Sequence, residues 1–194
     1  MRQSSTDRHG STPGIDERWL RSPLGAQGAM RDWLLDRGSL TARLKLLCRN
    51  FHVRVIAQGR VRGGPDEAPI LGARRTSLVG RDVLLMDGDV PLVFAHSVLR
   101  TDDLRGPWHA ISRLGSRPLG AALFADPRVE RRPLRFRRLH AGHPLYCAAT
   151  AATRDDLPPL WARRSVFCMR AAPLLVSEAF LPGLADCWQS NRLR

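Results

Sequence analysis

The sequence predicts an α+β protein built on a single antiparallel β-sheet with short helices packed on it. Two pairs of strand-like segments each meet at a tight turn, and the chain lacks the strand–helix–strand alternation that parallel sheets require. At 194 residues the chain is long enough for one domain with a substantial core. We therefore expect one domain over residues 29–194, preceded by a flexible N-terminal arm over residues 1–28.

The front of the expected domain is a pair of helices followed by a strand. The segment AMRDWLLDRG has amphipathic spacing and ends at Gly38, a residue type that commonly ends helices. Ser39 can cap a second helix, LTARLKLLCRN, because its hydroxyl accepts a free backbone N–H. From Phe51 the pattern changes to the alternation of FHVRVIAQGRV, which predicts a strand.

Two hairpins are expected to supply most of the remaining sheet. The runs SLVGRDVLLM and PLVFAHSVL flank Asp87-Gly88, and a DG step between two β-rich runs predicts a hairpin because its turn requires positive φ angles. The runs LWARRSVFCMR and PLLVSEAFLP predict a second hairpin, joined through residues 171–173. Between the hairpins, LRGPWHAISRLGSRPLGAALF predicts short helices with a tight turn at residues 115–118. The Pro-, Arg- and Ala-rich segment 126–158 is expected to be a long loop or insertion without a long regular element.

Charge and cysteine usage limit the classes of partner. The net charge is +13, which favours an anionic partner such as nucleic acid or a membrane surface. The basic residues are nearly all arginine, however, which indicates genome composition rather than a selected binding face. We expect the densest cluster, residues 128–138, to be a solvated loop, with a polyanion-binding patch as the alternative. No apolar run approaches the roughly 20 residues of a membrane span.

Four scattered cysteines without a CxxC pair indicate reduced thiols in a cytoplasmic protein and no zinc ribbon. His140 and His143 form an HxxH step, but no further ligand accompanies them, so no metal site is expected.

Two charges are expected on apolar strand faces, because side chains alternate along a strand. They are Arg81, beside Val79, Val83 and Leu85, and Glu178, beside Leu174, Val176 and Phe180. An isolated charge in such a place costs several kcal/mol or more, so each needs an opposite charge or a charged ligand. Two structural explanations stay open: the two charges pair with each other, or the opposite strand faces, with Leu84, Leu175 and Leu181, are the buried ones.

The order of five motifs resembles the chorismate lyase family of ubiquinone biosynthesis. The motifs are DWLLDRGSLTARL at 32–44, GRDVLL at 80–85, LGSRPLGAALF at 114–124, LWARRS at 160–165 and PLLVSEAFLP at 173–182. Together they cover the chain from Asp32 to Pro182 in the family's order. Three departures stand out: a longer segment between Phe124 and Trp161, Arg100 in place of a usual proline, and Ala162 in place of a glycine.

The resemblance implies helical flaps over a buried ligand pocket, and a cofactor-free lyase that removes pyruvate from chorismate to give 4-hydroxybenzoate. That reaction is the first committed step toward the ubiquinone ring. The resemblance also implies that Arg81 and Glu178 are the catalytic residues and contact the substrate, and that Leu119 binds it through its backbone. Leu40, where the family commonly has methionine, is implied to line the pocket.

The expected partners are therefore chorismate and 4-hydroxybenzoate, without nucleic acid, and the expected state is a monomer. Alternatives remain within and outside the enzyme class. One is a lyase that gives 3-hydroxybenzoate. A second is a non-catalytic small-molecule-binding module of the same fold, as in the effector domains of some bacterial transcription regulators. A basic nucleic-acid-binding protein is a third.

Overall fold

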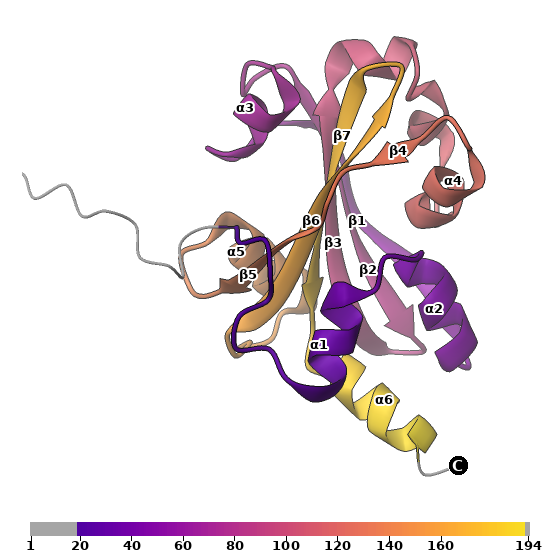
Figure 1. Cartoon of the computed structure of the whole chain (residues 1–194), viewed down its shortest axis with the longest axis vertical. Coiled ribbons are helices and arrows are strands. Elements are labelled where there is room, and N and C mark those ends of the chain that lie inside the picture. The colour runs from indigo at the N-terminus through magenta and orange to yellow at the C-terminus, as the bar shows by residue number, and fades with distance from the viewer. Residues whose placement is uncertain (1–18, 193–194) are drawn as a thin grey trace, which may run out of the picture.

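The protein, a computed structural model that describes residues 19–192, is built on one seven-stranded antiparallel sheet (Figure 1). Six strands follow the order β1-β2-β3-β7-β6-β4, and β5 also pairs with β6. The strands are β1 Phe51–Val61, β2 Leu78–Asp87, β3 Val90–Arg100, β4 Glu130–Arg131, β5 Arg135–Leu139, β6 Leu160–Met169 and β7 Ala172–Phe180. The predicted α+β class with a single antiparallel sheet is confirmed.

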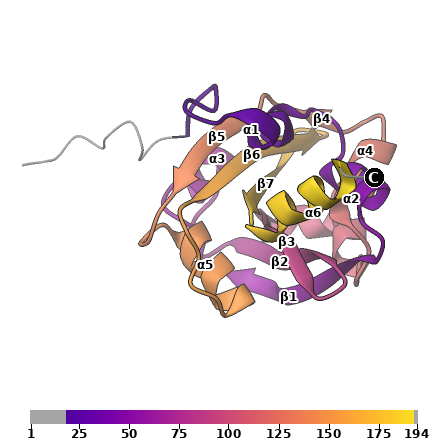
Figure 2. The same ribbon diagram turned by 90° about the horizontal axis from the view of Figure 1, so that it is seen from below.

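Short helices cover both faces of this sheet. They are α1 Gly28–Leu35, α2 Leu40–Leu47, α3 Glu67–Leu71, α4 Leu119–Ala125, α5 Pro144–Thr153 and α6 Gly183–Arg192, with two 3-10 helices, η2 Thr101–Arg105 and η3 His109–Arg113. Helices α2 and α4 lie on one side of the strands, and α3 and α5 lie on the other (Figure 1). Viewed from below, the sheet curls around α6 (Figure 2). Because both faces are covered, strand residues of either parity can be buried.

Both helices at the front of the domain form, with the predicted cap on α2, but α1 ends at Leu35 rather than at Gly38. The Oγ of Ser39 accepts a hydrogen bond from the backbone N–H of Ala42 at 3.2 Å, which satisfies one of the unpaired donors of the first turn of α2. Strand β1 spans the predicted residues 51–61. The chain therefore enters the sheet where the alternation begins.

Both hairpins form, and the second one turns one residue earlier than expected. Gly88 has φ 55° in the β2–β3 turn, but Asp87 already pairs with Val90, so the turn residues are Gly88 and Asp89 rather than the predicted Asp87 and Gly88. In the β6–β7 turn, Arg170 and Ala171 have φ 51° and 63°, and Ala172 already pairs with Met169. Two positive-φ residues match the right-handed twist of the flanking strands, which explains the tighter turn.

The expectation of a long loop over residues 126–158 is wrong. This segment contains β4, β5 and the ten-residue helix α5. Phe136 and Leu139 of β5 are buried, and the Nδ1 of His143 accepts a hydrogen bond from the backbone N–H of Leu145 at 3.1 Å, next to Pro144 at the start of α5. His143 therefore has a structural role, because it caps the start of α5. Whether the segment is an insertion relative to the family stays a prediction.

The predicted arm over residues 1–28 lies mostly outside the described residues, which begin at Trp19. Its last part contacts the domain: Leu20 and Phe136 exchange backbone hydrogen bonds of 2.8 and 2.9 Å, and Ala26 is buried in the core. The boundary at residue 28 stays a prediction. Among the described helices, none has the length and apolarity needed to cross a membrane.

Candidate active site

A cavity lies between the sheet and helices α2 and α4, and it contains every residue that the motifs singled out. The space between its walls, measured out to its mouth, is about 580 Å³. Leu40, Arg81, Leu119 and Glu178 all line it. Two further arginines, Arg131 and Arg163, line it as well. Residues that are far apart in the sequence are therefore brought together in one enclosed site.

The register of the sheet explains the floor of this cavity. Arg81 of β2 is opposite Ser97 of β3, which is opposite Val176 of β7. Glu178 lies in the next row along the same face, opposite Ala95. Two strand spacings across and two residues along put the Cα atoms of Arg81 and Glu178 about 12 Å apart. The two charges therefore lie in separate rows of the same face of the sheet, and both line the cavity.

Arg81 is held by the turn that precedes α4. Only 3% of the residue is exposed, and its Nη2 donates to the carbonyl of Gly115 at 2.7 Å and to that of Arg117 at 3.4 Å. Gly115 has φ 53°, a conformation that favours glycine, and this turn directs the carbonyl toward the arginine. Burial lowers the pKa of Arg81. The Nε of Arg81 is buried and has no hydrogen-bond partner among the described residues.

Glu178 pairs with a different arginine. The Nε of Arg163, on the neighbouring strand β6, donates to Oε2 of Glu178 at 2.6 Å, and the two residues are directly opposite each other. The side chain of Arg163 is completely buried, and that of Glu178 is 15% exposed. The Arg81–Glu178 pair that periodicity left open is therefore wrong, because these two residues lie in different rows with β3 between them.

The second structural explanation, that only the opposite strand faces are buried, is also wrong. Leu84, Leu175 and Leu181 are buried, as that explanation required. Arg81 and its neighbour Val83 are buried too. Helices on both sides remove both faces of the central strands β2, β3 and β7 from solvent, so the burial of one face says nothing against the other.

Arg163 also holds the end of helix α1 over the site. Its Nη1 donates to the backbone carbonyls of Trp33 at 2.8 Å and Asp36 at 2.7 Å, which are among the carbonyls that a helix C-terminus leaves unpaired. A cation at this end also interacts favourably with the helix dipole. The Nη2 of Arg163 is buried without a hydrogen-bond partner among the described residues.

Arg131 reaches the cavity from the short strand β4. Its Nε donates to Oγ of Ser165 at 2.9 Å, and its Nη1 donates to the carbonyl of Arg37 at 2.9 Å. Its guanidinium lies 5.5 Å from the ring centre of Phe124 and 5.2 Å from that of Phe167. Burial lowers the pKa of Arg131, while the charge of Glu178 acts in the opposite direction. The side chain is thus fixed by its backbone, hydroxyl and ring contacts.

Helix α4 covers the cavity at close range. Leu119 and Gly120 begin this helix and line the cavity opposite Leu40 of α2. A Cβ added at Gly120 would lie 3.0 Å from Oγ1 of Thr41 and 3.4 Å from Oγ of Ser39. Glycine therefore allows α4 to pack directly against the first turn of α2.

The charge of the cavity points to a dianionic ligand. Among its lining residues, the charged ones are the guanidiniums of Arg81, Arg131 and Arg163 and the carboxylate of Glu178, which leaves a formal charge of +2. The Nε of Arg81 and the Nη2 of Arg163 are donors that an acidic ligand in this cavity could satisfy. The fold and the cavity together are those of a domain suited to a small acidic molecule.

A second cavity adjoins the first. Phe124 and Arg131 line both of them. Its other basic residues are Arg21, Arg37, Arg132 and Arg135, and its space out to the mouth is about 1370 Å³. This space is larger and lacks both Arg81 and Glu178.

Comparison with known proteins identifies the family. Residues 18–192 match the chorismate lyase family, and the chain belongs to it. It is 51% identical to a "Probable chorismate pyruvate-lyase" of Thiobacillus denitrificans over 88% of this chain and 92% of that protein. It is 48% identical to a protein of the same description from Aromatoleum aromaticum, over 88% and 95% of the two chains.

Solved structures support the fold alone. The effector domain of PhnF from Mycobacterium smegmatis aligns with a TM-score of 0.53 at 15% identity, over 76% of this chain and 91% of that one. The C-terminal domain of YurK from Bacillus subtilis aligns with a TM-score of 0.50 at 13% identity, over 66% and 89%. These two domains and this chain therefore share the arrangement of the sheet.

Sequence reasoning missed Arg163 and Arg131. A signal for Arg163 was present in the sequence. Arg163 shares a strand face with Ser165 and Phe167, and a charge on such a face is the pattern that identified Arg81. Arg131 was assigned to a solvated loop because it lies within a run of arginines.

Proposed function

We propose that this protein is a chorismate pyruvate-lyase, which converts chorismate into pyruvate and 4-hydroxybenzoate. The observation that carries the proposal is the pair of buried guanidinium donors, on Arg81 and Arg163, that lack protein partners in a cavity also lined by Glu178. The family membership and the +2 charge of the cavity support the same substrate, because chorismate carries two carboxylates.

The reaction makes few demands on the protein. Chorismate is a cyclohexadiene with a ring carboxylate, a hydroxyl at C4 and an enolpyruvyl ether at C3. The C3–O bond breaks, the C4 hydrogen moves to the methylene carbon of the departing enolpyruvyl group, and the ring becomes aromatic. This elimination is downhill and balances without a metal, a nucleotide or a nicotinamide. The protein therefore acts by orientation and by excluding water, and positioning alone can contribute several kcal/mol.

We assign Arg81 to the ring carboxylate. Its planar guanidinium offers parallel donors to a carboxylate, and the carbonyls of Gly115 and Arg117 fix its orientation. The backbone N–H of Leu119 belongs to the first turn of α4, where helix geometry leaves donors unpaired, and it supplies a further hydrogen bond to the ligand. Leu40 packs against the ring from α2.

We assign Glu178 to the C4 hydroxyl. Its carboxylate accepts a hydrogen bond from that hydroxyl and sets the rotation of the ring, while Arg163 fixes the carboxylate from behind. Because the C4 hydrogen can pass to the enolpyruvyl group within the substrate, this role requires no protein base. Contact with a hydroxyl at C4 favours 4-hydroxybenzoate over 3-hydroxybenzoate as the product.

We assign Arg131 to the carboxylate of the enolpyruvyl group. It is the remaining cation of the cavity that is not committed to Glu178 or to the turn at Gly115, and it lies at the boundary with the second cavity. With this assignment Arg131 binds the substrate but not the aromatic product, since 4-hydroxybenzoate lacks the second carboxylate.

Incubation of the purified protein with chorismate in metal-free buffer tests the proposal, with products identified by chromatography. We expect pyruvate and 4-hydroxybenzoate in equal amounts, and loss of both with Glu178→Ala and Arg81→Ala. Formation of 3-hydroxybenzoate instead would show that the assignment of 4-hydroxybenzoate as the product is wrong. Tight binding of aromatic acids without turnover would favour a non-catalytic ligand-binding module.

We also propose that the enzyme is a cytoplasmic monomer. All four cysteines lie in the described part of the chain and none forms a disulfide, which suits a reducing compartment. Light scattering of the purified protein at several concentrations tests the monomer, and a concentration-independent mass of two chains would contradict it.

A further inference from the structure

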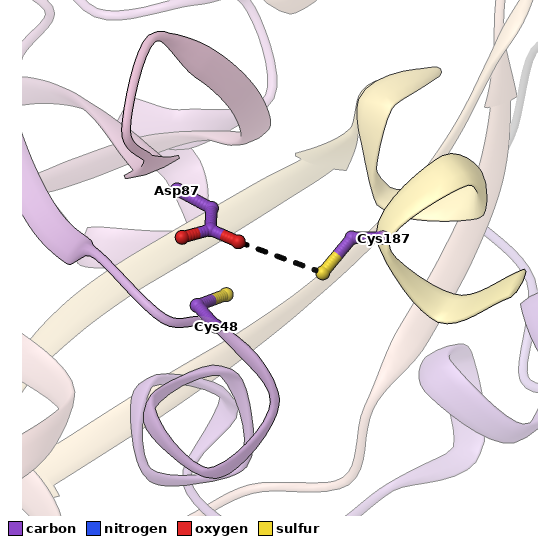
Figure 3. A group of neighbouring side chains, drawn as sticks. All are labelled: Cys48, Asp87 and Cys187. Atoms are coloured by element: carbon purple, nitrogen blue, oxygen red, sulfur yellow. Dashed lines mark hydrogen bonds between the residues drawn. The ribbon is translucent and has the colours of Figure 1, made fainter. Parts of the chain in front are cut away.

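Two cysteines and an aspartate meet away from the active-site cavity. Cys48 follows the last turn of α2, Asp87 is the last residue of β2, and Cys187 lies on α6 (Figure 3). The two sulfur atoms and a carboxylate oxygen all lie within 4.8 Å of one another. None of the three residues lines the proposed active site.

We propose that Cys48, Asp87 and Cys187 form a structural binding site for Zn²⁺. Two thiolates and one carboxylate are donors that zinc accepts in proteins, and zinc binds them without a redox change. Water supplies the fourth position of the tetrahedron. The binding balances as one ion taken up and two thiol protons released to the solvent.

The separations suit one small ion. Zinc lies about 2.3 Å from sulfur and about 2.1 Å from oxygen, so tetrahedral ligands are about 3.5–3.8 Å apart. The Sγ of Cys187 is 4.0 Å from Oδ2 of Asp87, and the sulfur and oxygen atoms of all three side chains point toward a common centre (Figure 3). The ligand atoms lie within 4.8 Å of one another, so a contraction of at most about 1.3 Å, within the reach of side-chain rotation, brings them to these separations.

Asp87 is already oriented for this role. Its Oδ1 accepts a hydrogen bond from the backbone N–H of Asn50 at 2.7 Å, which leaves Oδ2 on the side of the two sulfurs. Asp87 is also paired across the sheet with Phe51, so its backbone is fixed by β1. A hydrogen bond that holds the far oxygen of a ligating carboxylate is a common feature of metal sites.

The surroundings favour the protonated thiol of Cys48 as long as no cation is bound. Cys48 and Cys187 are half-buried, and burial together with the neighbouring groups raises the pKa of the Cys48 thiol. The Asp87 carboxylate contributes to that rise. A divalent cation bound beside the sulfur atoms would lower the pKa of the thiols. The negative charge of the Asp87 carboxylate would then attract the cation.

An ion at this point would join three elements that are distant in the sequence. It would fasten α6 to the end of α2 and to the β2–β3 hairpin. Because the first turn of α2 carries Leu40 and Thr41 of the cavity, the ion would stabilise the active-site wall without entering the chemistry. We therefore expect zinc to raise the unfolding temperature rather than to be required for turnover.

The test is titration of the chelator-treated, fully reduced full-length protein with Co²⁺ and then Zn²⁺. We expect one equivalent of Co²⁺, a thiolate-to-cobalt charge-transfer band, and displacement of the cobalt by one equivalent of Zn²⁺. Cys48→Ser and Cys187→Ser should each abolish the band, and Asp87→Asn should weaken binding. The matched control is the double variant Cys147→Ser/Cys168→Ser, which should retain the band and the stoichiometry.

Circular dichroism of each variant checks that loss of the band does not come from unfolding, and Cys187→Ala provides a second substitution where serine is poorly tolerated. Three outcomes would overturn the proposal. They are an unchanged band in folded Cys48→Ser, uptake of cobalt without thiolate bands, and Zn²⁺ that binds without raising the unfolding temperature of the unsubstituted protein.

Discussion

Arg163 and Glu178 are opposite each other on β6 and β7, and the fully buried guanidinium of Arg163 donates to the carboxylate at 2.6 Å. The same guanidinium binds two backbone carbonyls at the end of α1. The side chain of Arg163 thus links the carboxylate of Glu178 to the end of α1, the helix that precedes α2 in the wall of the cavity. Glu178 is held in position by the protein before any substrate arrives.

Removing Arg163 should destabilise the whole domain. Arg163→Met leaves Glu178 buried beside apolar groups and removes both donors from the end of α1, so we expect a loss of about 3–5 kcal/mol in the free energy of unfolding. Urea denaturation measures it. Arg128→Met, which breaks an exposed ion pair with Asp126, is the control and should change the stability little. Equal stabilities for the two variants would mean that the buried pair does not form.

Arg131 should distinguish the substrate from the product. We expect Arg131→Met to raise the KM for chorismate by about 10–100-fold, the effect of losing a charged hydrogen bond of about 1.5–3 kcal/mol. The inhibition constant of 4-hydroxybenzoate should change by less than about threefold, because it has no second carboxylate. Steady-state kinetics with both ligands gives the comparison, and the exposed neighbour Arg132→Met is the control. Equal losses for both ligands would contradict the assignment.

His96 should make the stability depend on pH in the alkaline range. Burial lowers the pKa of His96, but hydrogen bonds to Asp82 at 2.5 Å and contact with Glu67 at 3.2 Å outweigh it and raise that pKa to about 9. A raised folded-state pKa gives stability that is fully present below pH 6.5, the ordinary histidine value, and is lost as the pH rises through 9. The shift corresponds to about 3 kcal/mol.

Thermal or urea unfolding between pH 6 and pH 10 measures this contribution against His96→Gln, which cannot titrate. The stability difference between the two proteins should shrink across the window from pH 6.5 to pH 9. A difference that stays constant with pH would show that His96 is not charged in the folded protein.

Product release, not chemistry, should limit turnover. In the proposed binding mode the aromatic product is held at both ends in a cavity that α4 lines, so its release requires α4 to move. Rapid-quench measurement should show a burst of 4-hydroxybenzoate in the first turnover. Gly120→Ala should weaken the burst, since the added Cβ pushes α4 from Thr41. A linear time course from the first turnover would contradict rate-limiting product release.

Local patterns in the sequence were enough for most of the sheet and for the two charges that mark the site. Alternation and the Asp87-Gly88 step located β1, β2 and β3, and the position of a charge on an apolar strand face singled out Arg81 and Glu178. Periodicity fixes the face of a strand but not the register between strands. For that reason it could not tell that Glu178 pairs with Arg163 rather than with Arg81.

The missed elements depend on distant partners. The arginine-rich run around β5 has the composition of a solvated loop, and it becomes a strand because it pairs with β6, more than twenty residues later. The three donors of the proposed zinc site lie on α6 and near the ends of α2 and β2, and they share no sequence spacing. In both cases the deciding contacts are tertiary, and no local window contains them.

A crystal structure of the protein with 4-hydroxybenzoate bound tests the central claim most directly. We predict the ligand in the cavity under α4, with its carboxylate on Arg81 and the N–H of Leu119 and its hydroxyl on Glu178. A ligand found only in the neighbouring cavity, against Arg132 and Arg135 and without contact to Arg81 or Glu178, would contradict the account.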